Sequence, residues 1–236
     1  MKTFFGVSSD IPSNKRLKNG YTLYDWVMRQ KGFPLFWGRT ISGENAIDEE
    51  EIRFLRDKDC KVLLVVRELT EREVSATSGF DSAKRAIKAL EALNITSNQE
   101  VAIIAEIKPE WSVNHNWMIS FAQIISSHGF IPGFIGNTDS SKNFNFDRQC
   151  SHYVQATQDT EQYGAIYCAT EPKCDGAPEE WLPFCPSALE PENMQLWACG
   201  ETKFGNIKVD DIYAKDSKIL EKMFERKYNL NEQKTV

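Results

Sequence analysis

The stretch VAIIAEIKPEW, residues 101–111, places a carboxylate at the end of an apolar run. Five apolar residues precede Glu106, and Lys108 and Glu110 follow it closely. Such a run is typical of a buried strand, so Glu106 either marks the exit of that strand to solvent or lies at the mouth of a pocket. A carboxyl group beside apolar walls can stay protonated at neutral pH, as a general acid must. Glu106 is therefore the first candidate for a catalytic residue.

Other acidic, basic and aromatic residues stand at the ends of further apolar runs. The candidates for a second catalytic carboxyl group are Glu68 and Asp10, and the candidates for contact with a substrate are Trp37, Arg39, Glu110 and Trp197. Glycoside hydrolysis usually needs two carboxyl groups, one on each side of the scissile bond. Because tryptophan faces stack on sugar rings, this set of residues suits carbohydrate chemistry.

The same residues also have structural explanations. Glu68 can form an ion pair with Arg39 or Arg67, and the Ser-Ser-Asp sequence that ends at Asp10 is a good turn or helix cap. Trp197 can belong to the hydrophobic core. The sequence leaves these alternatives open. The three histidines are read as structural or solvent-facing, and no Ser-His-Asp or Cys-His arrangement can be singled out as a nucleophilic site.

Composition narrows the range of partners. The formal net charge is −6, with 26% charged and 41% hydrophobic residues. Because a phosphate-binding surface needs clustered Lys and Arg, we expect no nucleic-acid partner. No apolar run reaches about 18 residues, so no membrane partner is expected. The N-terminus has too short an apolar core for a signal peptide, which predicts a protein of the cytoplasm or one released without a cleaved signal. The expected partner is a polysaccharide or a small-molecule ligand.

The six cysteines show no CxxC or histidine-paired spacing, so no metal site is expected. A chain of 236 residues can bury enough core to fold without disulfides, and we expect free thiols. If the compartment is oxidising, Cys174 and Cys185 bracket a loop and form the most natural pair. The GxGxxG and GxxxxGK(S/T) fingerprints are absent, and no cofactor is expected.

Short strand-like runs alternate with helical patterns along the first half of the chain. The predicted strands are residues 4–9, 34–39, 61–66, 101–107, 130–136, 152–157, 164–170 and 194–200. The predicted helices are residues 21–31, 47–59, 81–93 and 113–129, with Asp81 as the N-cap of the third and Gly129 ending the fourth. Several strands are apolar on both faces, as in parallel sheets and barrels.

This alternation predicts an α/β protein built as a (β/α)8 TIM-like barrel that is irregular in its second half. Five prolines between residues 171 and 193 favour a long loop there. We expect one barrel domain over residues 1–227 and a polar tail over 228–236. The alternative is an open doubly wound sheet. Active sites of such barrels lie at the carboxyl ends of the strands, where the candidate residues fall.

Four segments resemble a known family. They are FFGVSSD (4–10), GFDSAKRAIKAL (79–90), VAIIAEI (101–107) and MQLWACGETKFGNIKVDDIYAKD (194–216). In their order and layout they resemble glycoside-hydrolase-like TIM barrels of unknown function that are related to the family-25 muramidases. The resemblance implies Glu106 as general acid and Glu68 or Asp10 as the second carboxylate. The family also has a closing strand with Trp-Gln-Tyr, followed by a Val-Asp pair before the last helix. Trp197 and Asp210 match this pattern, and the resemblance implies that they contact the substrate.

The chain departs from that family at three places. The family carries an Asp in its first strand, in the region of Ser8 here, and an Asp-x-Glu pair in its fourth strand, where this chain has Glu106-Ile107-Lys108. The Gln of a closing Trp-Gln-Tyr is Ala198. Three functions therefore stay open. The first is a barrel that acts on a polysaccharide such as peptidoglycan, and the second is an inactive pseudo-glycosidase that binds a glycan or a protein. An unrelated barrel enzyme for a small metabolite is the third.

Overall fold

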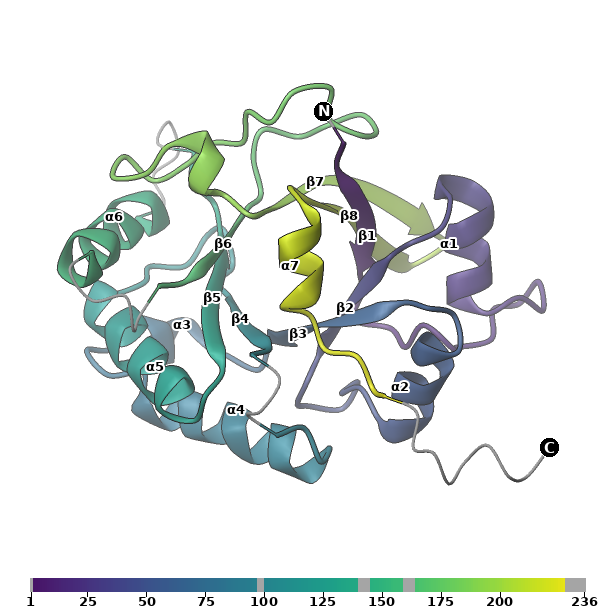
Figure 1. Ribbon diagram of the computed structural model, residues 1–236, viewed down its shortest axis with the longest axis horizontal. Helices are drawn as coiled ribbons and strands as arrows, with labels where there is room; N and C mark the ends of the chain where they lie inside the picture. The colour runs from purple at the N-terminus through teal and green to yellow at the C-terminus, as the bar shows by residue number, and fades with distance from the viewer. Residues whose placement is uncertain (1, 97–99, 140–144, 159–163, 228–236) are drawn as a thin grey trace.

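The computed structural model describes residues 2–96, 100–139, 145–158 and 164–227. Its eight strands form a closed barrel in chain order, with helices packed around the outside (Figure 1). The strands are β1 (Phe4–Ser8), β2 (Phe36–Thr40), β3 (Lys61–Val66), β4 (Ala102–Glu106), β5 (Ile131–Gly136), β6 (Ile166–Ala169), β7 (Leu196–Phe204) and β8 (Ile207–Ala214). The helices are α1 (Leu23–Lys31), α2 (Glu49–Arg56), α3 (Glu71–Val74), α4 (Phe80–Ala92), α5 (His115–Ser127), α6 (Phe146–Thr157), the 3-10 turn η3 (Pro191–Asn193) and α7 (Ser217–Glu221).

The last strand makes the barrel irregular. Strands β1 to β7 pair with their neighbours in parallel, whereas β8 runs antiparallel to both β7 and β1. The β1–β8 register runs from Phe4 opposite Ala214 to Ser8 opposite Asp210, and this ladder closes the barrel. The predicted barrel with an irregular second half is confirmed, and the alternative of an open sheet is excluded.

The strands are apolar on both faces because both faces are covered. In β3, Leu63 and Val65 belong to a cluster formed almost entirely by strand residues, which is the barrel interior. The alternate residues Val62, Leu64 and Val66 belong to the larger cluster between the barrel and its helices. Successive side chains of a strand point to opposite faces, so a continuous apolar run is what a strand of this kind requires.

The helix termini show how local sequence fixes the elements. Thr22 caps α1, and Asp48 caps α2 by accepting a hydrogen bond from the Glu51 amide at 2.7 Å. The predicted capping of α4 by Asp81 is wrong, since Gly79 is the N-cap. A Cβ at Gly79 would lie 2.4 Å from the Trp117 carbonyl oxygen, so this glycine permits the close approach of α4 to α5.

In the second half, one expected strand is wrong and one strand was not predicted. Residues 152–157, predicted as a strand, form the end of α6, because Phe146, Cys150 and Tyr153 are buried at helical spacing. The eighth strand is instead β8, a segment in which no strand was predicted. Its first five residues include three charged ones, so β8 shows no continuous apolar run.

The expectation of free thiols is wrong for two of the six cysteines, because Cys174 and Cys199 form a disulfide with their Cα atoms 4.9 Å apart. It is confirmed for Cys60, Cys150, Cys168 and Cys185. The Cys174 amide donates to the Cys199 carbonyl at 2.8 Å, which aligns the two segments. Cys185, the partner expected for Cys174, instead contacts the Leu189 carbonyl.

The two ends of the barrel differ. Helix α7 and the residues after it cover the end where the strands begin: the Ala102 amide donates to the Lys222 carbonyl at 2.7 Å, and Phe224 bridges to Val62 (Figure 1). The candidate site therefore lies at the opposite, open end. No helix within the described residues is long and apolar enough to cross a membrane. The expected polar tail, 228–236, lies outside the described residues.

Candidate functional site

A groove of about 330 Å³ opens at the carboxyl ends of the parallel strands. We use "the groove" for this cavity, whose walls include Ser8, Arg67, Glu106, Asn137, Glu171, Lys173, Glu201, Lys208 and Asp210. A side cavity of about 310 Å³ shares two of these residues and is lined by Asp10, Thr40, Glu44, Asn45, Arg67, Glu68, Glu106 and Lys108. Charged side chains of both signs therefore surround the open end of the barrel.

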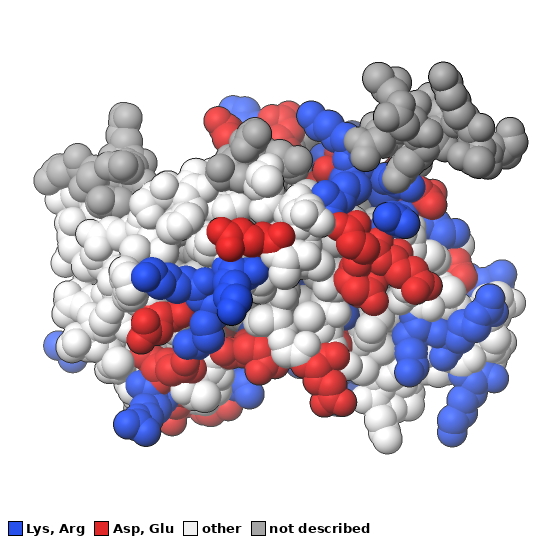
Figure 2. All heavy atoms as spheres, turned by 90° about the horizontal axis from the view of Figure 1, so that it is seen from below, with Lys and Arg blue, Asp and Glu red and all other residues white. Residues whose placement is uncertain are grey.

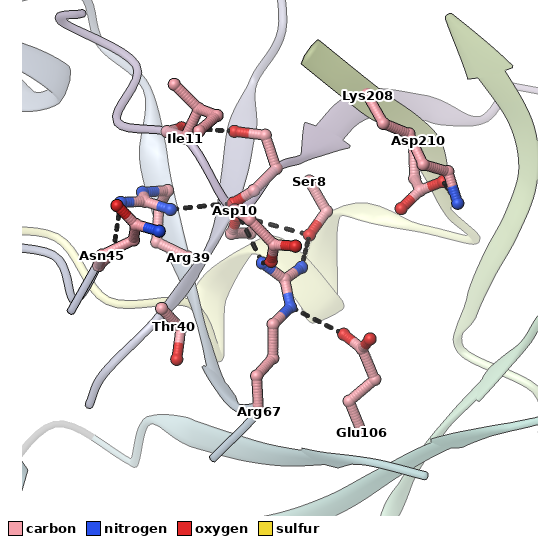
Figure 3. Close-up of polar contacts among 12 residues, drawn as sticks. Ser8, Asp10, Ile11, Arg39, Thr40, Asn45, Arg67, Glu106, Lys208 and Asp210 are labelled. Carbon is pink, nitrogen blue, oxygen red and sulfur yellow. Dashed lines mark hydrogen bonds and ion pairs between the residues drawn. The ribbon is translucent and has the colours of Figure 1, made fainter. Parts of the chain in front are cut away.

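Arg67, directly after β3, connects several of the candidate residues (Figure 3). Its Nε donates to Glu106 Oε2 at 2.8 Å, and its Nη1 donates to Asp10 Oδ1 at 2.7 Å and to the Ser9 carbonyl at 2.9 Å. Its Nη2 donates to the Ser8 hydroxyl. Only 13% of the Arg67 side chain is exposed, so these contacts fix the guanidinium at the junction of the two cavities.

The structure brings Asp10 and Glu106 together through this arginine. Glu106 is the last residue of β4, with 31% of its side chain exposed, whereas Asp10 follows β1 and is 75% exposed. Glu68 is also exposed, but it lines the side cavity, where its carboxylate lies against Gly43. Glu110 is exposed and lies outside the walls of both cavities.

Arg39 does not lie on the groove, in contrast to the sequence-based expectation. Its guanidinium is fully buried and donates through Nε to both carboxylate oxygens of Glu51, at 2.9 and 3.1 Å. It also donates to the carbonyls of Ser9 and Asn45, each at 2.8 Å. Burial lowers the pKa of Arg39, and the ion pair with Glu51 opposes that shift. In the described part of the chain, neither Arg39 nor Arg67 pairs with Glu68.

The two tryptophans expected to stack on sugars are buried as well. Trp37 has no exposed surface and donates its indole N–H to the Ser9 hydroxyl at 3.2 Å. Trp197 is 4% exposed, donates to the Pro172 carbonyl at 3.0 Å and packs edge-on against Trp181. Trp197 is therefore a core residue in this structure, and neither ring offers a free face to a ligand.

Asp210 on β8 lies across the groove from Glu106. In a closed barrel of eight strands in chain order, β4 and β8 are on opposite sides. Lys208 Nζ lies 3.1 Å from Asp210 Oδ1 and 3.0 Å from Glu201 Oε2. Burial raises the pKa of Asp210 and the charge of Glu106 adds to this, whereas Lys208 and Arg67 act in the opposite direction.

Arg67 is a central residue of the candidate site that the sequence analysis named only as an ion-pair partner. The available signal was its position at the end of a buried strand, where Glu106 also lies.

Among the described residues, no three His, Cys, Asp or Glu side chains are grouped as metal ligands. Figure 2 shows basic side chains in several separate groups among acidic ones on the face it presents. The site thus offers carboxyl groups and an arginine as its chemistry.

Comparison with known proteins supports the fold. No family model matches the chain, and no curated protein matches its sequence. Among solved structures, an uncharacterized protein of B. stearothermophilus is 21% identical over 94% of this chain and 100% of its own, with a TM-score of 0.76. A Tat-secreted protein of Mycobacterium tuberculosis, solved with HEPES, is 13% identical over 89% of this chain and 95% of its own, with a TM-score of 0.56. A family GH25 lysozyme from Aspergillus fumigatus is 10% identical over 94% of this chain and 98% of its own, with a TM-score of 0.51.

At these identities the likeness is one of fold. The chain shares its barrel fold with a family GH25 lysozyme, and the resemblance seen in the sequence is confirmed at the level of fold.

Proposed function

We propose that this protein acts on a polysaccharide such as peptidoglycan, which it binds in the groove between Glu106 and Asp210. The observation that carries the proposal is that carboxyl groups from opposite strands, β4 and β8, line one open groove. Two carboxyl groups on either side of the scissile bond are the usual requirement of glycoside hydrolysis. The barrel shared with a GH25 lysozyme supports a polysaccharide as the substrate.

Asp210 suits the position of the second carboxyl group better than the residues expected from the sequence. Asp10 is held by the same arginine as Glu106, and Glu68 lines the side cavity. Asp10 follows β1 and Glu68 follows β3, whereas Asp210 faces Glu106 across the groove. A pair that flanks a glycosidic bond must stand on both sides of the sugar chain.

A second candidate function is binding without turnover, and one observation favours it. Arg67 holds Glu106 in an ion pair, with a distance of 2.8 Å from Nε to Oε2. A general acid must carry a proton, so the expected role of Glu106 as acid requires this pair to open. The replacement of the family's acids near Ser8 and at Lys108 points in the same direction.

One variant separates the two functions. Glu106→Gln keeps the shape of the side chain and removes its charge, and Glu91→Gln on the outer helix α4 is the matched control. Binding is measured by co-sedimentation with insoluble peptidoglycan, and turnover by the release of reducing ends. If the protein is a hydrolase, Glu106→Gln should lower kcat by about 10²- to 10⁴-fold, while Glu91→Gln leaves it unchanged.

Peptidoglycan binding by the wild type without any release of reducing ends would instead establish the binding function. If the wild type neither sediments with peptidoglycan nor cleaves it, the assignment to this polysaccharide is wrong.

A further inference from the structure

We propose that Asp210 is the proton donor of the groove and that Glu106 is its ionised partner, the reverse of the role that family resemblance implies for Glu106. The inference rests on the proposed hydrolytic function. It follows from a difference between the cations that hold the two carboxyl groups.

Glu106 is paired with a cation that cannot leave or lose its charge. An arginine guanidinium stays protonated at every pH at which a protein is folded. Arg67 is also anchored by Asp10, Ser8 and the Ser9 carbonyl, so it does not swing away with Glu106 (Figure 3). Protonation of Glu106 would leave the Arg67 Nε without its charged acceptor in a site where only 13% of the side chain is exposed.

The ion pair between Asp210 and Lys208 is weaker than the one between Glu106 and Arg67. Lys208 divides its ammonium group between Asp210 at 3.1 Å and Glu201 at 3.0 Å, and 55% of the lysine side chain is exposed. Exposed lysine pairs of this kind contribute little. Glu201 is the cross-strand neighbour of Asp210, so a protonated Asp210 still leaves Lys208 with a carboxylate partner.

The surroundings of Asp210 also favour its neutral form. The charged groups that face it are Lys208 on the same strand, Glu201 on β7, and Glu106 and Arg67 across the groove. Glu171 and Lys173 also line the groove. Although 38% of the Asp210 side chain is exposed, burial raises the pKa of its carboxyl group; Lys208 opposes this shift without cancelling it, and the Glu106 carboxylate adds to it. Two carboxyl groups whose environments differ in this way are the usual basis for separate acid and base roles.

The reaction balances with these roles. The Asp210 carboxyl transfers its proton to the glycosidic oxygen as the bond between that oxygen and the anomeric carbon breaks. A water molecule forms the new bond to the anomeric carbon, and Glu106 accepts through Oε1 the proton that this water loses, while Oε2 keeps its hydrogen bond to Arg67. Exchange with solvent then returns the proton to Asp210, so one water is consumed for each bond cleaved.

The test uses two substrates that differ in their need for a proton donor. Peptidoglycan has a poor alcohol leaving group, whereas a 2,4-dinitrophenyl glycoside of an N-acetylglucosamine oligomer departs as a phenolate and needs no proton. We expect Asp210→Asn to lower kcat on peptidoglycan by about 10²- to 10⁴-fold but by less than about 10-fold on the aryl glycoside. Glu106→Gln should lower both rates alike, and Glu91→Gln should lower neither.

The pH profile gives an independent readout. Asp210→Asn should remove the alkaline limb of kcat/KM, because that limb reports loss of the donor's proton. Lys208→Met should move the limb to higher pH, because the ammonium group opposes protonation of Asp210. Carbon NMR of aspartate-labelled protein should show one carboxyl with a raised pKa that is absent from Asp210→Asn.

The outcomes distinguish the donor assignment from the hydrolytic function. If the aryl glycoside rescues Glu106→Gln and not Asp210→Asn, Glu106 is the donor and the inference is overturned while the hydrolytic function stands. If the wild type cleaves neither substrate, both are overturned. An NMR titration of Asp210 in the ordinary aspartate range overturns the inference by itself.

Discussion

Replacing Arg39 by methionine should destabilise the protein by roughly 3–5 kcal/mol, because it removes one partner of a buried ion pair. The two side chains, Arg39 and Glu51, are 0% and 2% exposed. Methionine fills a similar volume, so the packing change is small and the effect reports the lost charge and hydrogen bonds. In a protein of this size the same free energy corresponds to a fall in Tm of roughly 6–20 °C.

The magnitude follows from the groups that lose their donor. Glu51 would keep the Ser13 amide, which donates to it at 2.6 Å, but would have no cation. The carbonyls of Ser9 and Asn45 each lose a guanidinium donor at 2.8 Å. Each stranded buried acceptor costs about 1–3 kcal/mol, and a stranded carboxylate costs more, so the broken-pair value is the expected scale.

The double variant Arg39→Met with Glu51→Leu tests the cause. It removes both charges, so it should be more stable than Arg39→Met alone, because the main cost of the single change is the uncompensated carboxylate. Urea denaturation of the four proteins gives the free energies of unfolding and the coupling between the two sites. The reasoning is refuted if the single variant loses less than about 1 kcal/mol, or if the two changes simply add.

Three further predictions concern stability. Burial raises the folded-state pKa of Asp210, so the wild type should lose stability relative to Asp210→Asn as pH rises from about 4, where an unfolded aspartate titrates, through the raised value. Replacing Cys174 and Cys199 by serine removes a disulfide that joins residues separated by 25 positions in the sequence. The free energy of unfolding should fall by about 3–4 kcal/mol, because the unfolded chain gains the entropy that the closed loop had removed. Gly79→Ala places a Cβ 2.4 Å from the Trp117 carbonyl oxygen and should cost about 1–3 kcal/mol through displacement of α4 from α5.

Urea denaturation measures all three. A stability difference between wild type and Asp210→Asn that is constant from pH 4 to pH 8 would contradict the first prediction. For the second, mass spectrometry under non-reducing conditions reports the disulfide directly, and two free thiols would show that it is absent. An unchanged urea midpoint for Gly79→Ala would contradict the third prediction, because it would mean that α4 can move away from α5 without loss of stability.

Much of the barrel could be predicted because its signals are local. A continuous apolar run such as KVLLVV reflects a strand that is covered on both faces, and the alternation with amphipathic helices implies parallel pairing. The position of Glu106 at the end of such a run is enough to predict that it lies at the rim of the barrel. Strand β8 escaped this reasoning because it is antiparallel and its first half carries Lys208 and Asp210 toward the groove, which breaks the apolar pattern.

The site itself depended on contacts between distant segments. The predicted strand 34–39 places Trp37 and Arg39 near its end, as substrate contacts would be, but both side chains are buried. The chain after β1 and after β2 supplies the carbonyls of Ser9 and Asn45 that accept from Arg39. Arg67 lies next to Glu68 in sequence yet pairs with Glu106, 39 residues away. Residue type and strand position do not encode such partners.

By itself, then, the sequence determined the order of most strands and helices and the end of the barrel where Glu106 lies. Its apolar periodicity and strand boundaries report how each segment is covered, which is a local property. Only the tertiary structure decided that Arg67 holds Glu106, that Asp210 faces it across the groove, and that Cys174 pairs with Cys199. These facts depend on how closing the barrel brings together residues far apart in the chain, and the charge state of a carboxyl group depends on those neighbours.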